Sequence, residues 1–176
     1  MGDRVRARDG CGEAQAGALL SEGDAPPKGL DLARAAVAAR AYEDAERALR
    51  EVLALAPDHR EALDLIGFVL FFLERSAEAE PFVRRAVELY PDHAYCWKGL
   101  GMHLVRLGRH DEGFSAIERA TELRPDWFDP HWDYLVMALR VGSQARFDAM
   151  FDRARSRFPQ EAARLAALLR QAPAAP

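Results

Sequence analysis

Lysine is almost absent from this sequence. Lys28 and Lys98 are the only lysines among 24 basic residues, and the formal net charge is −4. A chain with this charge lacks the diffuse positive surface by which many nucleic-acid-binding proteins attract phosphates. We therefore expect no nucleic-acid partner. The excess of arginine over lysine, together with abundant alanine, favours a GC-rich bacterial genome as the source.

Cysteines and long apolar runs are also scarce. Cys11 and Cys96 are the only cysteines, which excludes a disulfide framework and favours a reducing compartment. No run reaches the ~18 apolar residues of a membrane span, and residues 1–20 lack the apolar core of a secretory signal. We predict a cytoplasmic protein with no membrane partner. Hydrophobic residues make up 49% of the chain, enough to form a core.

Motifs for catalysis are missing as well. The sequence contains no glycine-rich phosphate loop, no nucleophile elbow and no pair of acidic residues at a catalytic spacing. The five histidines do not form a ligand set, because His93 and Cys96 have a suggestive spacing but no third ligand near them in the sequence. We expect no enzyme activity, no metal and no cofactor.

Proline, in contrast, recurs at a fixed interval. Pro57, Pro91, Pro125 and Pro159 are separated by steps of 34 residues, and aspartate follows the first three of them. A period held this strictly is typical of a chain built from stacked copies of one small unit. Each proline disfavours helical geometry at the residue before it, so each is expected to follow the end of a helix.

Each interval divides into two helical stretches. Asp58 is the expected N-cap of the first helix in the second interval. In the fourth interval Asp129 is the expected N-cap, with Pro130 at the first helical position. Gly108 and Gly142 mark the breaks between the two helices of the third and fourth intervals. The sequence therefore predicts a series of helix pairs.

This pattern resembles the tetratricopeptide repeat family, whose unit is a helix–turn–helix of 34 residues. The third repeat matches the family's pattern best, at Trp97, Leu100, Gly101, Leu104, Ile117, Ala120 and Pro125. The second matches it at Leu63, Ile66, Gly67, Leu70, Ala79, Val83, Ala86 and Pro91. The resemblance implies an all-α fold, a right-handed α-solenoid of four repeats.

The expected repeats span residues 26–59, 60–93, 94–127 and 128–161. A capping helix at 162–171 completes a repeat domain over residues 28–171, because a repeat array needs a solvated face at its end. Residues 1–27 are predicted to be a mostly disordered leader, and residues 172–176 a frayed tail.

Small residues face each other inside the repeats. Gly101 faces Gly113, which lets the two helices of the third repeat approach closely. The fourth repeat has Leu135 and Phe147 at these positions, which predicts splayed helices or irregular packing. Pro81 lies inside the second helix of the second repeat and is expected to shorten or kink it.

Residues 66–73 are apolar on every side of their helix. At ~100° per residue, Ile66 and Leu70 point in one direction, while Phe68, Phe71 and Phe72 lie on the opposite side. Leaving three phenylalanines in water forgoes about 1.5–3 kcal/mol for each. We therefore expect something to cover them.

The family packs so that the far face of each first helix lines a concave groove. The resemblance places Phe68, Phe71 and Phe72 in this groove. It adds residues of the third and fourth repeats: Tyr95, Lys98, Met102, Val105, Arg106, Trp132, Val136, Leu139 and Arg140. The charged rim is expected to consist of Lys98, Arg106, Arg140, Glu61, Asp64 and Asp129. The paired basic residues by which some members bind a peptide carboxylate are absent.

Three functions follow as hypotheses. The first is a protein–protein interaction module that holds an apolar or amphipathic segment in the groove, as an adaptor, scaffold, assembly factor or chaperone. The second is a self-assembling structural protein whose groove is filled by another copy, a homo-oligomer. The third is a ligand-binding protein or enzyme that uses the acidic and aromatic stretch 126–134.

Overall fold

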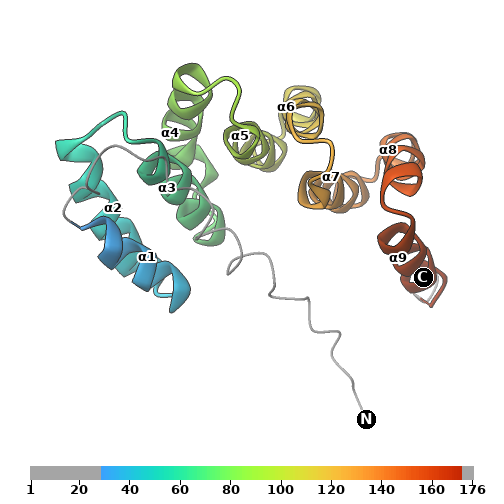
Figure 1. Ribbon diagram of the computed structural model, residues 1–176, viewed down its shortest axis with the longest axis horizontal. Helices are drawn as coiled ribbons and strands as arrows, with labels where there is room; N and C mark the ends of the chain where they lie inside the picture. Colours follow the sequence, from blue (N-terminus) through green and yellow to red (C-terminus); the bar gives the residue numbers. More distant parts are fainter. Residues whose placement is uncertain (1–28, 172–176) are drawn as a thin grey trace, which may run out of the picture. The chain divides into compact units, whose positions relative to one another are not determined.

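The computed structural model describes residues 29–171, and these residues form helices and turns without a strand (Figure 1). They belong to two compact units, divided between Pro91 and Asp92, which are described here one at a time. The predicted leader, residues 1–27, and the predicted tail, residues 172–176, lie outside the described residues.

Unit 1 contains two helix pairs. They are α1 (Leu30–Ala38) with α2 (Tyr42–Leu55), and α3 (Arg60–Phe72) with α4 (Ser76–Leu89). Helix α2 packs against both α1 and α3, so the two pairs share a continuous core. The largest side chains of that core are fully buried: Leu30, Leu49, Leu63, Ile66 and Leu70.

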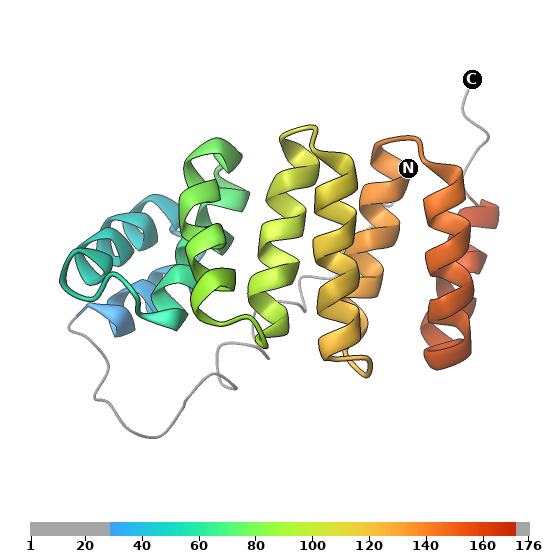
Figure 2. The same ribbon diagram turned by 90° about the horizontal axis from the view of Figure 1, so that it is seen from above.

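Unit 2 contains two further pairs and a last helix. The pairs are α5 (Ala94–Arg106) with α6 (His110–Leu123), and α7 (Phe128–Arg140) with α8 (Gln144–Arg157). Figure 2 shows α5, α6, α7 and α8 running in alternating directions, so that α5 and α7 point the same way. Helix α9 (Pro159–Gln171) packs on α8, and its residues Ala162 and Leu165 are buried there.

The predicted fold class, an all-α protein of tetratricopeptide helix pairs, is confirmed. Each of the four predicted repeat ranges contains one helix pair. A further helix follows the fourth pair, although α9 already begins at Pro159 and not at residue 162. The fixed proline period thus places the turns between pairs correctly.

The predicted helix starts are wrong in detail. Asp58 is not the N-cap of α3, because its carboxylate accepts hydrogen bonds from Arg85 at 3.0 and 3.1 Å. His59 takes that place, and its Nδ1 accepts the N–H of Ala62 at 3.3 Å. Helix α7 begins at Phe128, before the predicted cap Asp129.

The turn inside each pair uses the same backbone conformation in all four repeats. Gly108 and Gly142 have φ angles of 79° and 69°, as the sequence predicted for left-handed helix ends. Arg40 and Glu74 stand at the equivalent places in the first two repeats, with φ angles of 57° and 59°. A side chain is unfavourable in this region, so the first two turns are held against a local cost.

Replacing Glu74 by glycine is therefore expected to raise the free energy of unfolding of unit 1 by about 0.5–1 kcal/mol. The substitution removes the steric cost of the left-handed conformation and adds only the smaller entropy cost of glycine. Urea unfolding followed by circular dichroism measures the change. The reciprocal variant Gly108→Glu should lose stability by a similar amount, and a loss in Glu74→Gly would contradict the explanation.

Two packing expectations have different outcomes. Helix α4 is not shortened by Pro81, because it has 14 residues, as α2, α6 and α8 have. The close approach in the third repeat is confirmed, since a Cβ placed on Gly101 would lie 2.6 Å from the carbonyl oxygen of Gly113. In the fourth repeat Leu135 and Phe147 are both buried and fill the corresponding space.

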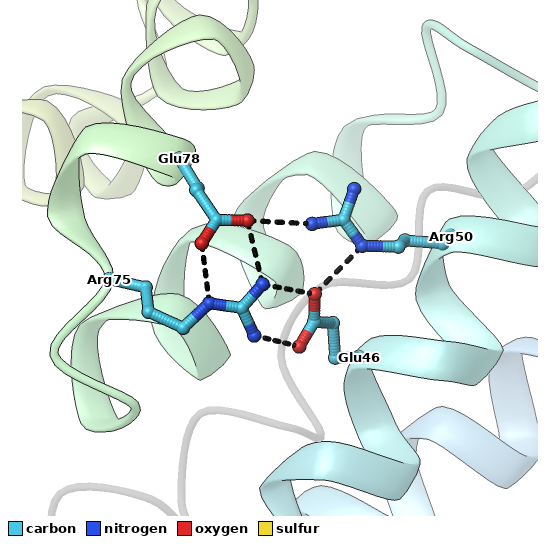
Figure 3. A network of polar contacts seen from close by, with 4 residues as sticks. All are labelled: Glu46, Arg50, Arg75 and Glu78. Atoms are coloured by element: carbon cyan, nitrogen blue, oxygen red, sulfur yellow. Dashed lines mark hydrogen bonds and ion pairs between the residues drawn. The ribbon is translucent and has the colours of Figure 1, made fainter.

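A network of four charged residues ties the two pairs of unit 1 together (Figure 3). The Nη2 of Arg75 donates to Glu46 at 3.1 Å, and its Nε and Nη2 donate to Glu78 at 2.6 Å. Arg50 donates to Glu46 at 2.8 Å from the same helix. Burial of Glu46 opposes its ionisation, but the hydrogen bonds from Arg50 and Arg75 outweigh it, so the pKa of this carboxyl lies below its ordinary value.

Candidate functional site

Unit 1 carries a group of four aromatic rings, which we call the aromatic cluster: Tyr42, Phe68, Phe71 and Phe72. The ring of Phe72 is central. Its centroid lies 4.8 Å from Phe68, 5.9 Å from Phe71 and 5.0 Å from Tyr42, which stacks on it. Tyr42 also meets Phe68 edge-on at 6.4 Å. The rings therefore stabilise one another across α2 and α3.

The aromatic cluster is only partly covered. Phe68 and Phe71 are half-buried, and Phe72 keeps 49% of its surface exposed. The charges near it on α1 and α3 are already paired, because Nε and Nη2 of Arg34 each donate to the Glu61 carboxylate at 2.6 Å. A surface of this kind offers apolar area without a free charge to direct a polar ligand.

Unit 2 carries a second candidate surface on α5 and α7, which we call the α5–α7 face. Its residues point away from α6 and α8 and are half-buried or exposed: Tyr95, Met102, Arg106, Asp129, Trp132, Val136, Leu139 and Arg140. Trp132 is 37% exposed and Leu139 is 44% exposed. Both belong to α7, three and four residues away from Val136, so they form one apolar stripe.

Lys98 and Asp133 form a buried ion pair that joins α5 to α7. The Nζ of Lys98 lies 2.9 Å from Oδ2 of Asp133, and the side chains are 11% and 18% exposed. Burial raises the pKa of the Asp133 carboxyl above its ordinary value, and the ammonium of Lys98 opposes that shift. Lys98 is therefore occupied within the protein and is not offered to a ligand.

Two further rings surround this pair. The rings of Tyr95 and Trp127 are stacked, with centroids 6.1 Å apart and an interplanar angle of 18°. The Nζ of Lys98 lies 5.7 Å from the centroid of Tyr95 and 5.3 Å from that of Trp127. The guanidinium of Arg124 lies 4.9 Å from the ring of Trp127. These cation–π contacts fix the start of α7 beside α5.

Several expected site residues are not available to a partner. Val105 is 4% exposed and faces α6, where a Cβ on Gly113 would lie 2.6 Å from its Cγ2. The expected rim residues Glu61 and Asp64 are 6% and 5% exposed, so they are buried. Lys98 is buried in its ion pair. Placing these four side chains on an open surface is wrong.

The acidic and aromatic stretch 126–134 is used mainly for packing. Tyr134 is 4% exposed and stacks at 4.6 Å on Phe114. His131 is 6% exposed, lies 5.1 Å from the ring of Phe158, and holds the carbonyl of Trp127 through Nδ1 at 3.2 Å. Burial lowers the pKa of His131. The side chains of this stretch that could have formed a ligand site are thus occupied.

Sequence reasoning missed Tyr42, Trp127 and Asp133 as members of these surfaces. Each meets its partners on another helix: Tyr42 meets α3, and Asp133 meets α5. A helical wheel compares residues within a single helix, so it gives no sign of such contacts. The acidic Asp133 one period after the apolar Gly99 was the only available signal.

Helices long and apolar enough to cross a bilayer were not found in residues 29–171.

Paired helices of constant length, joined by short turns at a fixed period, define a helical repeat protein. The family model for the tetratricopeptide repeat matches residues 30–93 and 65–130, together more than half of the chain. The chain belongs to the tetratricopeptide repeat family, whose members are in general protein interaction modules. No curated protein gives a significant match to the sequence.

Solved structures agree with this fold. The chain is 24% identical to YrrB, described as a TPR protein with an unusual peptide-binding site, with a TM-score of 0.68 over 79% of this chain and 72% of that one. It is 20% identical to MamA, with a TM-score of 0.67 over 77% and 79% of the two chains. It is 33% identical to a mutant of the Thermobaculum terrenum O-GlcNAc transferase, with a TM-score of 0.65, but covers only 25% of that enzyme against 73% of itself.

Proposed function

We propose that the protein binds an apolar or amphipathic segment of another protein on the surfaces formed by its first helices. The aromatic cluster of unit 1 is the principal contact, and the α5–α7 face of unit 2 is a second one. Membership of the tetratricopeptide repeat family supports an interaction module. The described peptide-binding site of YrrB, a protein of the same fold, supports a peptide as the ligand.

The single observation that carries this proposal is the exposure of Phe72. Its ring is 49% exposed although three other aromatic rings stand around it. Removing a phenylalanine from water is worth about 1.5–3 kcal/mol, so a partner that covers this ring gains a large share of its binding energy there. The paired charges of Arg34 and Glu61 leave an apolar segment as the best-matched ligand.

Phe72→Asp tests the proposal without disturbing the core. The variant should lose at least about 90% of the proteins that co-purify with the tagged chain from its native cell, since a buried unpaired charge at the centre of a contact costs several kcal/mol. Quantitative mass spectrometry measures the loss. Circular dichroism should be unchanged, because the position is half in solvent.

Leu55→Asp is the matched control. Leu55 is 77% exposed and stands at the other end of α2 from Tyr42, about 20 Å along the helix. This variant introduces the same charge into the same unit and should retain the captured proteins. Retention of those proteins by Phe72→Asp as well would refute the assignment of the aromatic cluster. A dimer in light scattering that Phe72→Asp abolishes would identify a second copy as the occupant.

A further inference from the structure

Charge is distributed unevenly along the α5–α7 face. Helices α5 and α7 run in the same direction (Figure 2), and arginine is the last residue of each, Arg106 and Arg140. At the opposite end, Asp129 lies in the first turn of α7. Arg140 is exposed and has no ion-pair partner within residues 29–171. The face is therefore basic at one end and acidic at the other.

An apolar stripe lies between the two charged ends. Trp132, Val136 and Leu139 follow one another at steps of four and three residues on α7, and Met102 stands on α5 at the place equivalent to Val136. A stripe with this spacing matches the apolar residues of an amphipathic helix at positions i, i+4 and i+7. The 13 residues of α7 span about 20 Å, the length of nearly four helical turns.

Lys98 does not alter this polarity. It lies between the two ends, but its ammonium is neutralised by Asp133 at 2.9 Å and is buried. The available positive charge is thus confined to the arginines at the ends of α5 and α7. A ligand with a carboxylate meets that charge only if the carboxylate lies at this end of the face.

Stable helices share one charge bias. Acidic residues favour the first turn and basic residues the last turn, because the backbone dipoles leave partial positive charge at the start and partial negative charge at the end. A partner helix antiparallel to α7 brings its acidic first turn to Arg106 and Arg140, and its basic last turn to Asp129. A parallel helix brings like charges together at both ends.

We infer that the α5–α7 face binds an amphipathic helix antiparallel to α5 and α7, with the acidic first turn of that helix beside Arg106 and Arg140. This inference rests on the proposed function of this face. It adds the chemistry of the partner and the direction in which the partner lies.

Two synthetic peptides of about 16 residues test the direction. Both carry leucine at i, i+4, i+7 and i+11. The forward peptide has two glutamates in its first turn and two lysines in its last turn, and the reversed peptide has these charges exchanged. Calorimetric titration into the full chain at low salt should show the forward peptide binding about fivefold to tenfold more tightly. High salt should reduce the difference.

The reversed peptide is also a weaker helix when free, so the decisive measurement is the change in the ratio of the two affinities. The double variant Arg106→Glu/Arg140→Glu should reduce the ratio at least about fivefold. The control Arg119→Glu/Arg155→Glu changes net charge equally, at exposed positions on the second helices α6 and α8. It should leave the ratio as it is in the unchanged protein.

The outcomes separate the inference from the proposal beneath it. An unchanged ratio in Arg106→Glu/Arg140→Glu would overturn the antiparallel direction. Equal binding of both peptides that Leu139→Glu abolishes would keep the face as a docking surface and still overturn the direction. Binding of neither peptide would overturn docking at this face altogether, while leaving the aromatic cluster of unit 1 to be judged by Phe72→Asp.

Discussion

Replacing Lys98 by methionine lowers the free energy of unfolding of unit 2 by about 3 kcal/mol at pH 7. Methionine fills a similar volume but leaves the Asp133 carboxylate buried without its counter-ion, and an unpaired buried charge is among the most costly defects in a folded protein. The value is at the lower end of the usual range because the two side chains keep 11% and 18% of their surface in solvent.

The loss depends on pH in a defined direction. Burial already raises the pKa of Asp133, and removing Lys98 takes away the charge that opposes this shift. A carboxyl whose pKa is raised in the folded state binds protons more tightly there than in the unfolded chain. The variant is therefore most stable below the ordinary pKa of an aspartate, and it loses stability as the pH rises through the raised pKa. Its deficit should shrink from pH 7 to pH 4.

Urea titrations at several pH values measure this dependence. All three tryptophans of the chain, Trp97, Trp127 and Trp132, belong to unit 2, so their fluorescence reports its unfolding. Lys98→Met/Asp133→Leu removes both charges and should recover most of the stability. A deficit in Lys98→Met that stays constant from pH 4 to pH 7 would show that lost packing, and not the buried carboxylate, causes the loss.

Gly101→Ala is expected to destabilise unit 2 by about 2–3 kcal/mol. Its Cβ would lie 2.6 Å from the carbonyl oxygen of Gly113 and 2.9 Å from the backbone nitrogen of Ile117. Both atoms belong to the backbone of α6, so no side-chain rotation relieves the overlap, and the two helices must separate. The separation loses contacts along the best-packed pair of the unit.

Gly99→Ala is the control for this prediction, two residues away on the same helix. A Cβ at Gly99 meets nothing within 4 Å. This variant should therefore gain about 0.5–1 kcal/mol from the higher helix propensity of alanine. The same fluorescence-detected urea unfolding measures both. Similar stability changes in the two variants would mean that glycine at 101 matters for the helix backbone and not for the contact with α6.

The repeats were predictable because they are written in local signals. A proline at each interval of 34 residues, small residues such as Gly101 and Gly113 at facing positions, and glycines at two of the turns each act over a few residues or within one pair. The helix caps were less predictable. Asp58 is a good capping residue by type, but a pair with Arg85 on α4 competes for its carboxylate.

The candidate surfaces were predictable in part. The apolar run of α3 has more hydrophobic sides than one partner helix covers, and its Phe72 is indeed exposed. The wheel that placed Val105 and Lys98 beside Met102 was misled for a physical reason. Each side chain near the edge of a helical face reaches a neighbouring helix, α6 for Val105 and α7 for Lys98. Side-chain length and the angle between helices decide such contacts.

By itself, the sequence determined the helix pairs, their number in the repeat region and the turns between them, because helix propensity, proline and glycine act through the local backbone. Only the tertiary structure decided which charges are spent inside the protein and which aromatic rings remain open. A charge is neutralised, and a ring is covered, by whatever residue another helix brings within a few ångströms, and that distance does not exist until the helices have packed.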